Sequence, residues 1–281
     1  ATTTGTVTAS ITTTESITEL KTLTETTNAY TIVISSADAT ANAADLSTID
    51  GKTTATVDAS AVTAISGNYD EITALYGTAG VTGLGNESID LNERLTVIQA
   101  NVIDGLTQGV VTAAIDPSET VDSLQTLTGI NAYTIVISSA DATGSTASEF
   151  NTINGLTTGT IDTTAVTSLA HDSISNINTL LTAGNDTAQF TNTSFSQLSS
   201  VSVLDVTHYL ANNTDVAAFF SAVNGYSTTA QQEAGATKHY DDFGITEGRH
   251  DGSIDVSDLN VAIAEANIAT GTTAELSLIH I

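Results

Sequence analysis

The chain has 281 residues and a formal net charge of −27, with 32 acidic and only five basic residues. This balance argues against nucleic acids and anionic membranes as partners, since both demand clustered Lys and Arg. Cysteine is absent, which excludes disulfides and thiolate metal sites. No apolar run approaches the roughly 18 to 20 residues needed to cross a bilayer, so we expect no membrane span. High acidity with little Lys and no Cys is typical of extracellular bacterial proteins.

The chain begins with a Thr-rich stretch, residues 1–13, in which Val7, Ala9 and Ile11 alternate with hydroxyl side chains. Alternation with a period of two and many β-branched residues predict a strand. No helix or turn signal ties this strand to the unit that follows. We therefore expect Val7, Ala9 and Ile11 to form an assembly strand that joins another copy of the protein. A disordered Thr-rich tail is the alternative.

A helix is predicted next, because Ile17, Leu20 and Leu23 have helical spacing. Thr14 precedes it, and Glu15 lies in its first turn, where the helix dipole favours an anion. The continuous apolar run AYTIVIS then predicts a strand covered on both faces. Further along the chain, NAADLSTIDG reads as a helix and TTATVDA as a strand. SAVTAIS and NYDEITALYGTAG read as further short helical turns.

A block of thirteen residues, NAYTIVISSADAT, occurs unchanged at Asn28–Thr40 and Asn131–Thr143. Identity of this length indicates an internal duplication. Between the two blocks, ERLTVIQANVIDG reads as a helix, GVVTAAI as a strand, and Pro117 as the first residue of another helix. After the second block, SEFNTING reads as a helix and TTGTIDT as a strand.

The recurring unit is a short helix, a turn and a short strand, repeated about every 24 to 27 residues, a period typical of solenoids. Each unit is too small to bury its apolar face alone, so the strands should stack into a parallel sheet with right-handed crossovers. We expect an α/β repeat solenoid over residues 14–200, with a compact, internally duplicated α/β domain as the alternative. Asp50 and Asp104 should be helix stops, because Asn154 replaces the carboxylate in a third copy of the Ile-Asp-Gly pattern.

The composition changes near residue 200. Residues 201–250 concentrate aromatic side chains, and Tyr209, Val216 and Phe219 have helical spacing, so we expect a helical insertion or a small mainly helical domain. Residues 251–281 predict a final amphipathic helix and a closing strand. Both ends of the chain are thus expected to be strand-like.

Two motifs resemble known families. The pattern A-x-D-L-x-T-I-D-G-x-T-T-x-T-V-D-A-S-x-V-T at Ala44–Thr63, echoed by Ser148–Thr167, resembles the Thr-rich repeats of very large cell-surface and secreted proteins of marine cyanobacteria and related bacteria. H-Y-L-x-x-N-x-D-V-x-A at His208–Ala218, followed by H-Y-x-x-F-G-x-x-E-G-R at His239–Arg249, is similar to a short helical motif of bacterial surface and calcium-binding secreted proteins. That motif usually has Pro where this chain has Thr214. The resemblance implies an extracellular surface protein and names no reaction.

Calcium is the cofactor that the sequence favours. Asp251, Ser253, Asp255 and Asp258 place oxygen ligands at nearly alternate positions, as a loop that wraps a hard cation requires. Ala262 stands where an EF-hand would have its bidentate Glu. The alternative is that Asp255 only caps the final helix.

Other site chemistry has little support in the sequence. Nothing marks a nucleophile paired with a base, and no phosphate-binding glycine pattern occurs, so we expect no enzyme. The consecutive Asp241 and Asp242 would diverge on most backbones, which argues against a pair of catalytic carboxylates. His208 and His239 are candidates for a shared zinc site, but packing of each beside its neighbouring tyrosine is favoured.

We expect an extracellular structural protein of the cell surface, a subunit that self-assembles into a filament, sheath or layer through strand-mediated contacts. A homopolymer is therefore the expected partner. The alternative is an adhesion or ligand-binding module of a giant secreted surface protein, which binds glycans, calcium or a surface. An ice-binding face is less favoured, since the Thr-x-Thr ranks lack regular spacing.

Overall fold

The protein was analysed as a computed structural model, which describes residues 5–24, 26–172, 176–177, 179–180, 190, 200–203 and 206–239. These residues form an α/β structure of parallel strands and short helices. They divide into two compact units. Unit 1 comprises the described residues within Ala1–Glu119, Ser123–Val136 and Gly155–Thr160, and unit 2 comprises those within Thr120–Asp122, Ile137–Asn154 and Ile161–Ile281.

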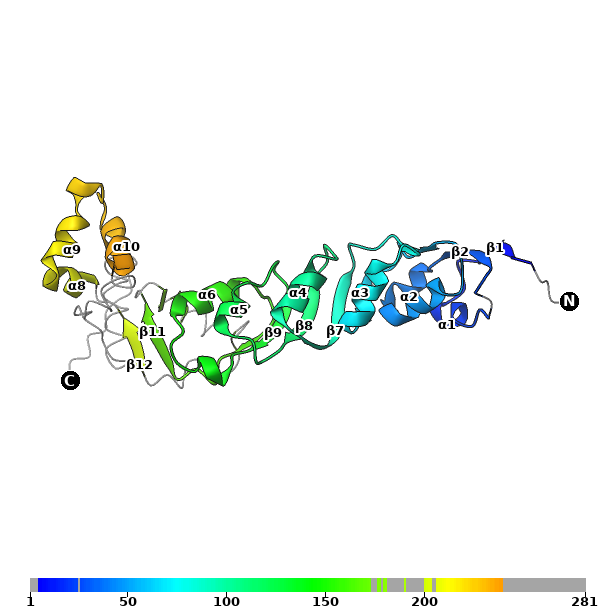
Figure 1. The fold of residues 1–281 in the computed structure, drawn as a ribbon, viewed down its shortest axis with the longest axis horizontal. Coiled ribbons are helices and arrows are strands. Elements are labelled where there is room, and N and C mark those ends of the chain that lie inside the picture. Colours follow the sequence, from blue (N-terminus) through cyan, green and yellow to red (C-terminus); the bar gives the residue numbers. More distant parts are fainter. Residues whose placement is uncertain are drawn as a thin grey trace. The chain divides into compact units, whose positions relative to one another are not determined.

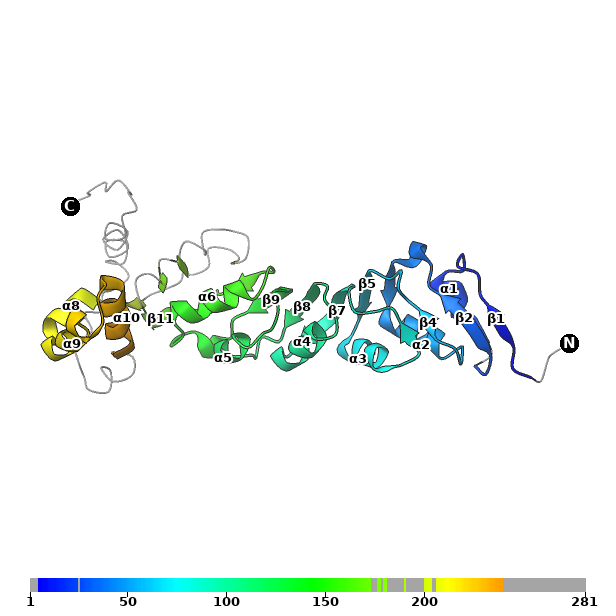
Figure 2. The same cartoon turned by 90° about the horizontal axis from the view of Figure 1, so that it is seen from above.

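Unit 1 contains two parallel sheets with helices alongside them (Figure 1). In chain order its elements are β1 (Thr8–Ser10), α1 (Ile17–Leu20), β2 (Ala29–Val33), the 3-10 helix η1 (Ser36–Asp38), β3 (Thr40–Asn42), α2 (Ala43–Asp50), β4 (Val57–Asp58), β5 (Ala64–Gly67), α3 (Tyr69–Gly77), β6 (Val81–Thr82), β7 (Ser88–Leu95), α4 (Val97–Asp104), β8 (Val111–Ile115) and β9 (Ala132–Val136). The first sheet has the strand order β1-β2-β4-β6, and the second runs β9-β8-β7-β5-β3 within this unit. Strand β1 is thus the edge of the first sheet, and Figure 2 shows it beyond β2.

Both copies of the thirteen-residue block form a strand, as predicted, but Thr31 and Thr134 are exposed, so neither strand is covered on both faces. Ile32 in β2 and Ile135 in β9 are each 1% exposed. Each strand leads through a serine cap into a 3-10 turn, with Ser35 before η1 and Ser138 before η2 (Ser139–Asp141). Identical sequences therefore adopt the same local structure, although β2 belongs to the first sheet and β9 to the second.

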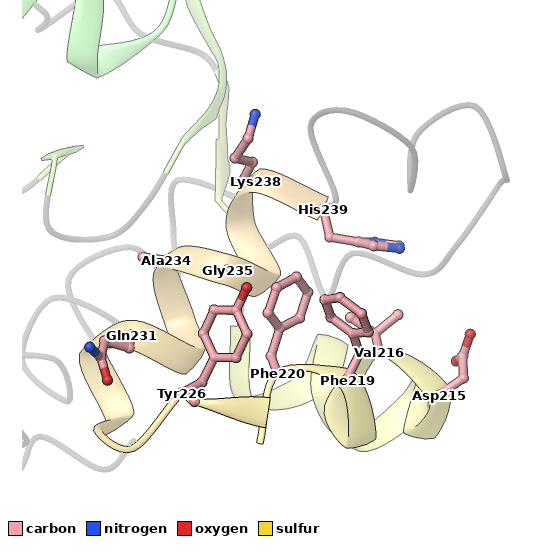
Figure 3. A pocket seen from close by; sticks show the side chains of 11 residues that line it. Asp215, Val216, Phe219, Phe220, Tyr226, Gln231, Ala234, Gly235, Lys238 and His239 are labelled. Atoms are coloured by element: carbon pink, nitrogen blue, oxygen red, sulfur yellow. The ribbon is translucent and has the colours of Figure 1, made fainter. Parts of the chain in front are cut away.

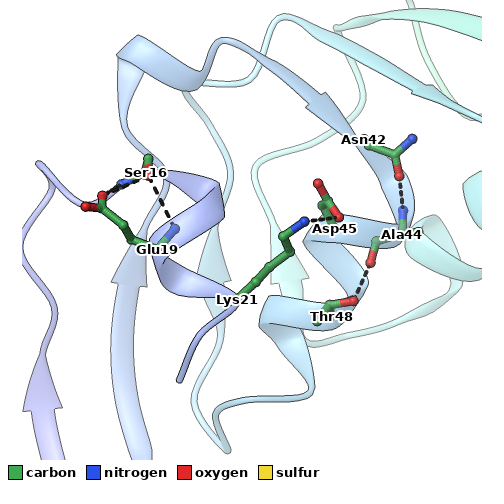
Figure 4. Close-up of polar contacts among 7 residues, drawn as sticks. All are labelled: Ser16, Glu19, Lys21, Asn42, Ala44, Asp45 and Thr48. Atoms are coloured by element: carbon green, nitrogen blue, oxygen red, sulfur yellow. Dashed lines mark hydrogen bonds and ion pairs between the residues drawn. The ribbon is translucent and has the colours of Figure 1, made fainter. Parts of the chain in front are cut away.

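Helix starts in unit 1 are fixed by side-chain caps. Ser16 caps α1: its hydroxyl accepts from the Glu19 N–H, and the Glu19 carboxylate accepts from the Ser16 N–H (Figure 4). Asn42 accepts from the Ala44 N–H at 2.9 Å at the start of α2. Both caps satisfy backbone donors that the first helical turn leaves unpaired. The helix predicted after Thr14 therefore begins later, at Ile17.

One predicted helix is wrong, and another begins later than predicted. SAVTAIS contains the strand β5, not a helical turn, because residues 64–66 pair in parallel with residues 40–42 of β3. Pro117 lies in a turn, where the Asp116 carboxylate accepts from the backbone N–H and the hydroxyl of Ser118, and α5 (Val121–Leu124) begins only at Val121. Long-range pairing and a local Asp turn override the helical spacing at these sites.

Unit 2 combines short strands with a helical region. Its elements are η2, α6 (Ala147–Gly155), β10 (Ile161–Asp162), β11 (Ser168–Asp172), β12 (Ser200–Val203), α8 (Val206–Asn212), α9 (Thr214–Phe219), η3 (Ala222–Asn224) and α10 (Thr229–His239). Strands β11 and β12 pair in parallel. Helices α8 to α10 share a small core of Tyr209, Val216, Phe220 and Ala236. The predicted helical character of the region after residue 200 is thus present in residues 206–239.

Candidate functional site

The predicted calcium ligands Asp251, Ser253, Asp255 and Asp258 lie outside the residues that the structure describes. Within the described residues, no group of three or more His, Asp or Glu side chains is placed to hold a metal ion. The predicted assembly residues Val7, Ala9 and Ile11 can be placed, because they lie in and beside β1.

Strand β1 pairs with its own chain, contrary to the expectation that nothing ties Val7, Ala9 and Ile11 to the unit that follows. The Ala29 N–H donates to the Val7 carbonyl at 2.8 Å, and the Ile11 N–H donates to the Thr31 carbonyl at 2.9 Å. The prediction failed because a strand's partner, unlike its period, is not encoded locally. The opposite edge of β1 carries no paired strand among the described residues.

Strand β1 is the counterpart of β8. The sequences VTASI at Val7–Ile11 and VTAAI at Val111–Ile115 match, and both strands pair with a copy of the duplicated block. This match lies beyond the thirteen identical residues, and comparing the flanking sequences over a longer range would have found it. It extends the duplication to a strand before each block.

The two copies differ in how far they are covered. Val111, Ala113 and Ile115 are 0%, 4% and 1% exposed, whereas Val7 is 37% exposed and Ala9 and Ile11 are only partly buried. Leu127 is 4% exposed, whereas its counterpart Leu23 is partly buried. In the second copy, β7 and α4 precede β8 and contribute this cover. We call the surface formed by Gly5, Val7, Ala9, Ile11 and Leu23 the open face; the side chain of Asn28 is buried beside it.

An asparagine–tyrosine pair occurs in both copies. The Val7 N–H donates to Asn28 Oδ1 at 2.8 Å, and the Val111 N–H donates to Asn131 Oδ1 at the same distance. Asn28 Nδ2 donates to the Tyr30 hydroxyl at 2.6 Å, and Asn131 Nδ2 donates to the Tyr133 hydroxyl at 3.2 Å. Each asparagine thus fixes the strand in front of its block.

Asn131 also binds the end of helix α4. Its Nδ2 donates to Asp104 Oδ1 at 2.7 Å, and the Thr128 hydroxyl donates to Asp104 Oδ2 at 2.8 Å. Gly129, with φ of 70°, allows this approach, because a Cβ there would lie 2.4 Å from Asp104 Oδ1. Burial raises the pKa of Tyr133 to about 12, and the nearby charge of Asp104 adds to the rise.

The aspartates of the Ile-Asp-Gly pattern therefore do more than end helices. Asp50 and Asp104 are the last residues of α2 and α4, as predicted. Asp50 Oδ2 also accepts from the Thr78 hydroxyl at 3.0 Å, as Asp104 does from Thr128. The available signal was a Thr followed closely by Gly, 24 to 28 residues after each aspartate. Each carboxylate links its helix to the next part of the chain.

A further set of carboxylates caps helix starts from a distance. The first or second backbone N–H of five helices donates to a carboxylate 20 to 24 residues later in the chain. The acceptors are Asp38 for α1, Glu93 for α3, Glu119 for α4, Asp141 for α5 and Asp172 for α6. A carboxylate at a helix N-terminus is favoured by the helix dipole and needs no cation. Many acidic residues therefore have structural partners, which composition alone does not reveal.

The helical region of unit 2 holds an open pocket of about 840 Å³ (Figure 3). Val216, Phe219, Phe220 and Tyr226 form its apolar lining, and Asp215, Gln231, Lys238 and His239 add polar groups. Gly235 lets Phe220 approach α10, because a Cβ there would lie 2.3 Å from Phe220 Cδ1. Phe219 remains 59% exposed.

His239 has its predicted packing partner, the neighbouring Tyr240, outside the described residues, so that packing stays a prediction. Its Nδ1 lies 2.9 Å from the hydroxyl of Tyr209, thirty residues earlier, and this contact joins α10 to α8. The side chain of His208 lies outside the described residues. A zinc site shared by the two histidines stays untested, while the His239–Tyr209 bond gives one of them a packing role.

Among the described residues, no helix has both the length and the apolar character needed to cross a membrane. Comparison of the whole chain with known proteins found no matching family model, no similar curated protein and no similar solved structure.

Proposed function

We propose that this protein is an extracellular structural subunit that assembles with further copies of itself into a filament, sheath or layer of the cell surface. The observation that carries the proposal is the outer edge of β1. On the side away from β2, no strand among the described residues pairs with its backbone. Unpaired edges of parallel sheets are templates for another chain. The high acidity, the absence of cysteine and the Thr-rich repeats support the extracellular assignment.

The finer architecture that we propose is a repeat solenoid over residues 14–200. Two regularities support it. Successive strands pair in parallel, as Ile32 does with Val57 and Val57 with Val81. Helix starts also bind carboxylates at a nearly constant separation of 20 to 24 residues. A solenoid buries its core by stacking, so its ends either need caps or accept another copy.

The edge can be blocked without disturbing the fold. Val7 and Ile11 use their backbone groups on the β2 side, so the backbone groups of the intervening Thr8 and Ser10 point to the opposite edge. Thr8→Pro removes one outward N–H and leaves the bonds to β2, since proline is tolerated on edge strands. Thr8→Ala is the matched control, because it keeps the N–H.

We expect wild type and Thr8→Ala to form filaments or sheets in negative-stain images and large species in light scattering. Thr8→Pro should melt at nearly the wild-type temperature and assemble poorly. A wild-type protein that stays monomeric at all concentrations would contradict the proposed function. Equal assembly of all three proteins would show that the β1 edge is not the contact.

The alternative function, an adhesion or ligand-binding module of a giant secreted protein, is supported by the pocket beside α9 and α10. Phe219 and Tyr226 offer aromatic faces on which sugar rings stack, and Lys238 and Asp215 offer polar contacts. A glycan-array signal that Phe219→Ala abolishes, without loss of helical circular dichroism, would favour this function. If the wild type gives no signal, the adhesion function is contradicted and only the assembly proposal remains.

A further inference from the structure

The second copy of the duplication shows which elements can cover the surface that corresponds to the open face. In the second copy, β7 and α4 bury the counterparts of Val7, Ala9 and Ile11 to 4% exposure or less. In the first copy, the described residues supply no such cover. We infer that the open face binds a strand and a helix end from a second copy of this chain, in the arrangement that β7 and α4 adopt on β8.

Gly5 gives an independent sign that a backbone approaches this face. Its counterpart Gly109 precedes β8, and a Cβ on Gly109 would lie 2.3 Å from the Glu87 carbonyl oxygen, next to the start of β7. Glycine is thus required at 109 by the chain packed against it. At Gly5, a Cβ would meet nothing within 4 Å. The first copy therefore keeps a space that its own described residues do not fill.

The same comparison identifies the polar contact. Asn131 Nδ2 donates to Asp104 at the end of α4, whereas the contacts found for the Asn28 side chain are the Val7 N–H and the Tyr30 hydroxyl. Asn28 is only 4% exposed, so its position is fixed. Its amide matches the carboxylate or amide at a helix end of the Ile-Asp-Gly or Ile-Asn-Gly type, a pattern that the chain contains three times.

The surface differs in character from the edge of β1 alone. The β1 edge supplies backbone hydrogen bonds and would accept many extended chains. The open face adds an apolar stripe and a glycine whose counterpart, Gly109, is closely approached by backbone, and the Asn28 amide lies beside it. Together these groups select a partner built like this chain's own repeats, and they set the register of the contact. The inference rests on the proposed self-assembly and defines one of its two contact surfaces.

The duplication also supplies matched variants. Gly5→Ala places a methyl group in open space, so the isolated chain should fold and melt as the wild type does. Gly109→Ala places the same methyl group against the Glu87 carbonyl and should lower the melting temperature. Asn28→Asp retains acceptors for the Val7 N–H and the Tyr30 hydroxyl but loses the donor for a partner carboxylate.

The experiment is sedimentation velocity of the full chain over a range of concentrations, with thermal melts of the same samples. We expect the wild type to associate and both Gly5→Ala and Asn28→Asp to associate about tenfold or more weakly, with an unchanged melt for Gly5→Ala, which alters no buried group. Gly109→Ala, in contrast, should lower the melting temperature. If Gly5→Ala and Asn28→Asp associate as the wild type does, the open face is not the contact, although self-assembly stands. If the wild type never associates, both proposals fail.

Discussion

At the scale of single residues, Tyr133 and its partners show how much the surroundings of one side chain change its chemistry. Tyr133 is fully buried, receives a hydrogen bond from Asn131 and lies near the Asp104 carboxylate. Tyr30, in the other copy, has the same asparagine partner but is only partly buried. The phenol of Tyr133 therefore resists ionisation more than an exposed tyrosine would.

The raised pKa of Tyr133 predicts a loss of stability at alkaline pH. Its pKa is about 12 in the folded protein, against an ordinary value of 10.0. The folded state thus holds the proton more tightly, so this contribution is complete below pH 10 and decreases as the pH rises towards 12. Denaturant unfolding at a series of pH values should show this decrease. Tyr133→Phe, which cannot ionise, should show a smaller decrease, and an equal decrease in both proteins would contradict the assignment.

The buried isoleucines of the duplicated blocks make a second prediction at this scale. Ile32→Ala and Ile135→Ala should each lower the free energy of unfolding by about 2 to 5 kcal/mol, because each leaves a cavity in a packed sheet. Urea titrations followed by circular dichroism would measure both. Thr31→Ala, an exposed neighbour on β2, is the control and should change little. A tolerant Ile135 would mean that the two strands are not equivalent in packing.

At the scale of elements, the short helices depend on carboxylates supplied from elsewhere in the chain. Helices of four to nine residues are marginal by themselves, so capping contributes a large share of their stability. Helix α3 has an internal cap, in which Asn68 and Glu71 bond reciprocally, and an external one, in which the Tyr69 N–H donates to Glu93 at 2.7 Å.

The external cap of α3 can be tested by comparing two substitutions. Glu93→Ala should lower the free energy of unfolding by about 0.5 to 1 kcal/mol, since it removes both a hydrogen bond and a charge at the helix N-terminus. Glu93→Gln keeps an acceptor and should cost less. Asp90→Ala, at another exposed acid of β7, is the control and should be nearly neutral. If Glu93 contributes only to solubility, all three variants should have the same free energy of unfolding, which would contradict the cap.

Sequence patterns predicted the elements whose signal is local. The apolar run AYTIVIS forms β2 and β9, and the pattern that ends in Ile-Asp-Gly ends α2 and α4, as expected, although residues 93–95, predicted to start α4, belong to β7. The patterns failed where a distant partner decides, as in β5, whose pairing with β3 overrides its helical spacing. The same limit applies to the open face: an alternating strand was visible, but its pairing with β2 and the missing cover were not.

At the scale of the whole molecule, the charge of −27 opposes the compact state. The carboxylates that cap helices stabilise some of this charge locally, and Lys21 pairs with Asp45 at 2.7 Å. Five basic residues cannot neutralise 32 acids, so counter-ions must supply the rest. Calcium remains the candidate, through the untested loop at Asp251–Asp258.

A calcium role predicts a metal-dependent melting temperature. A ligand that binds only the folded state raises stability by mass action. We expect a higher midpoint in millimolar calcium than in chelator at fixed ionic strength. The double variant Asp251→Asn, Asp255→Asn should lose this difference. Equal midpoints for the wild type in both conditions would contradict a calcium role and leave only general screening of the charge by salt.

The match of β1 with β8 has a consequence for the length of the chain. Val7 and Val111 are 104 residues apart, yet they have the same asparagine contact and the same following strand. If the segment between two equivalent positions is lost or gained, the residues joined there keep packing contacts that the chain already contains. We expect a chain in which Val7 is followed directly by Thr112 to fold, with its helix and strand contacts kept and Gly5 still at one end. A cooperative melt of that shortened chain would show that evolution can change the span of the molecule in steps of one copy without redesigning a contact.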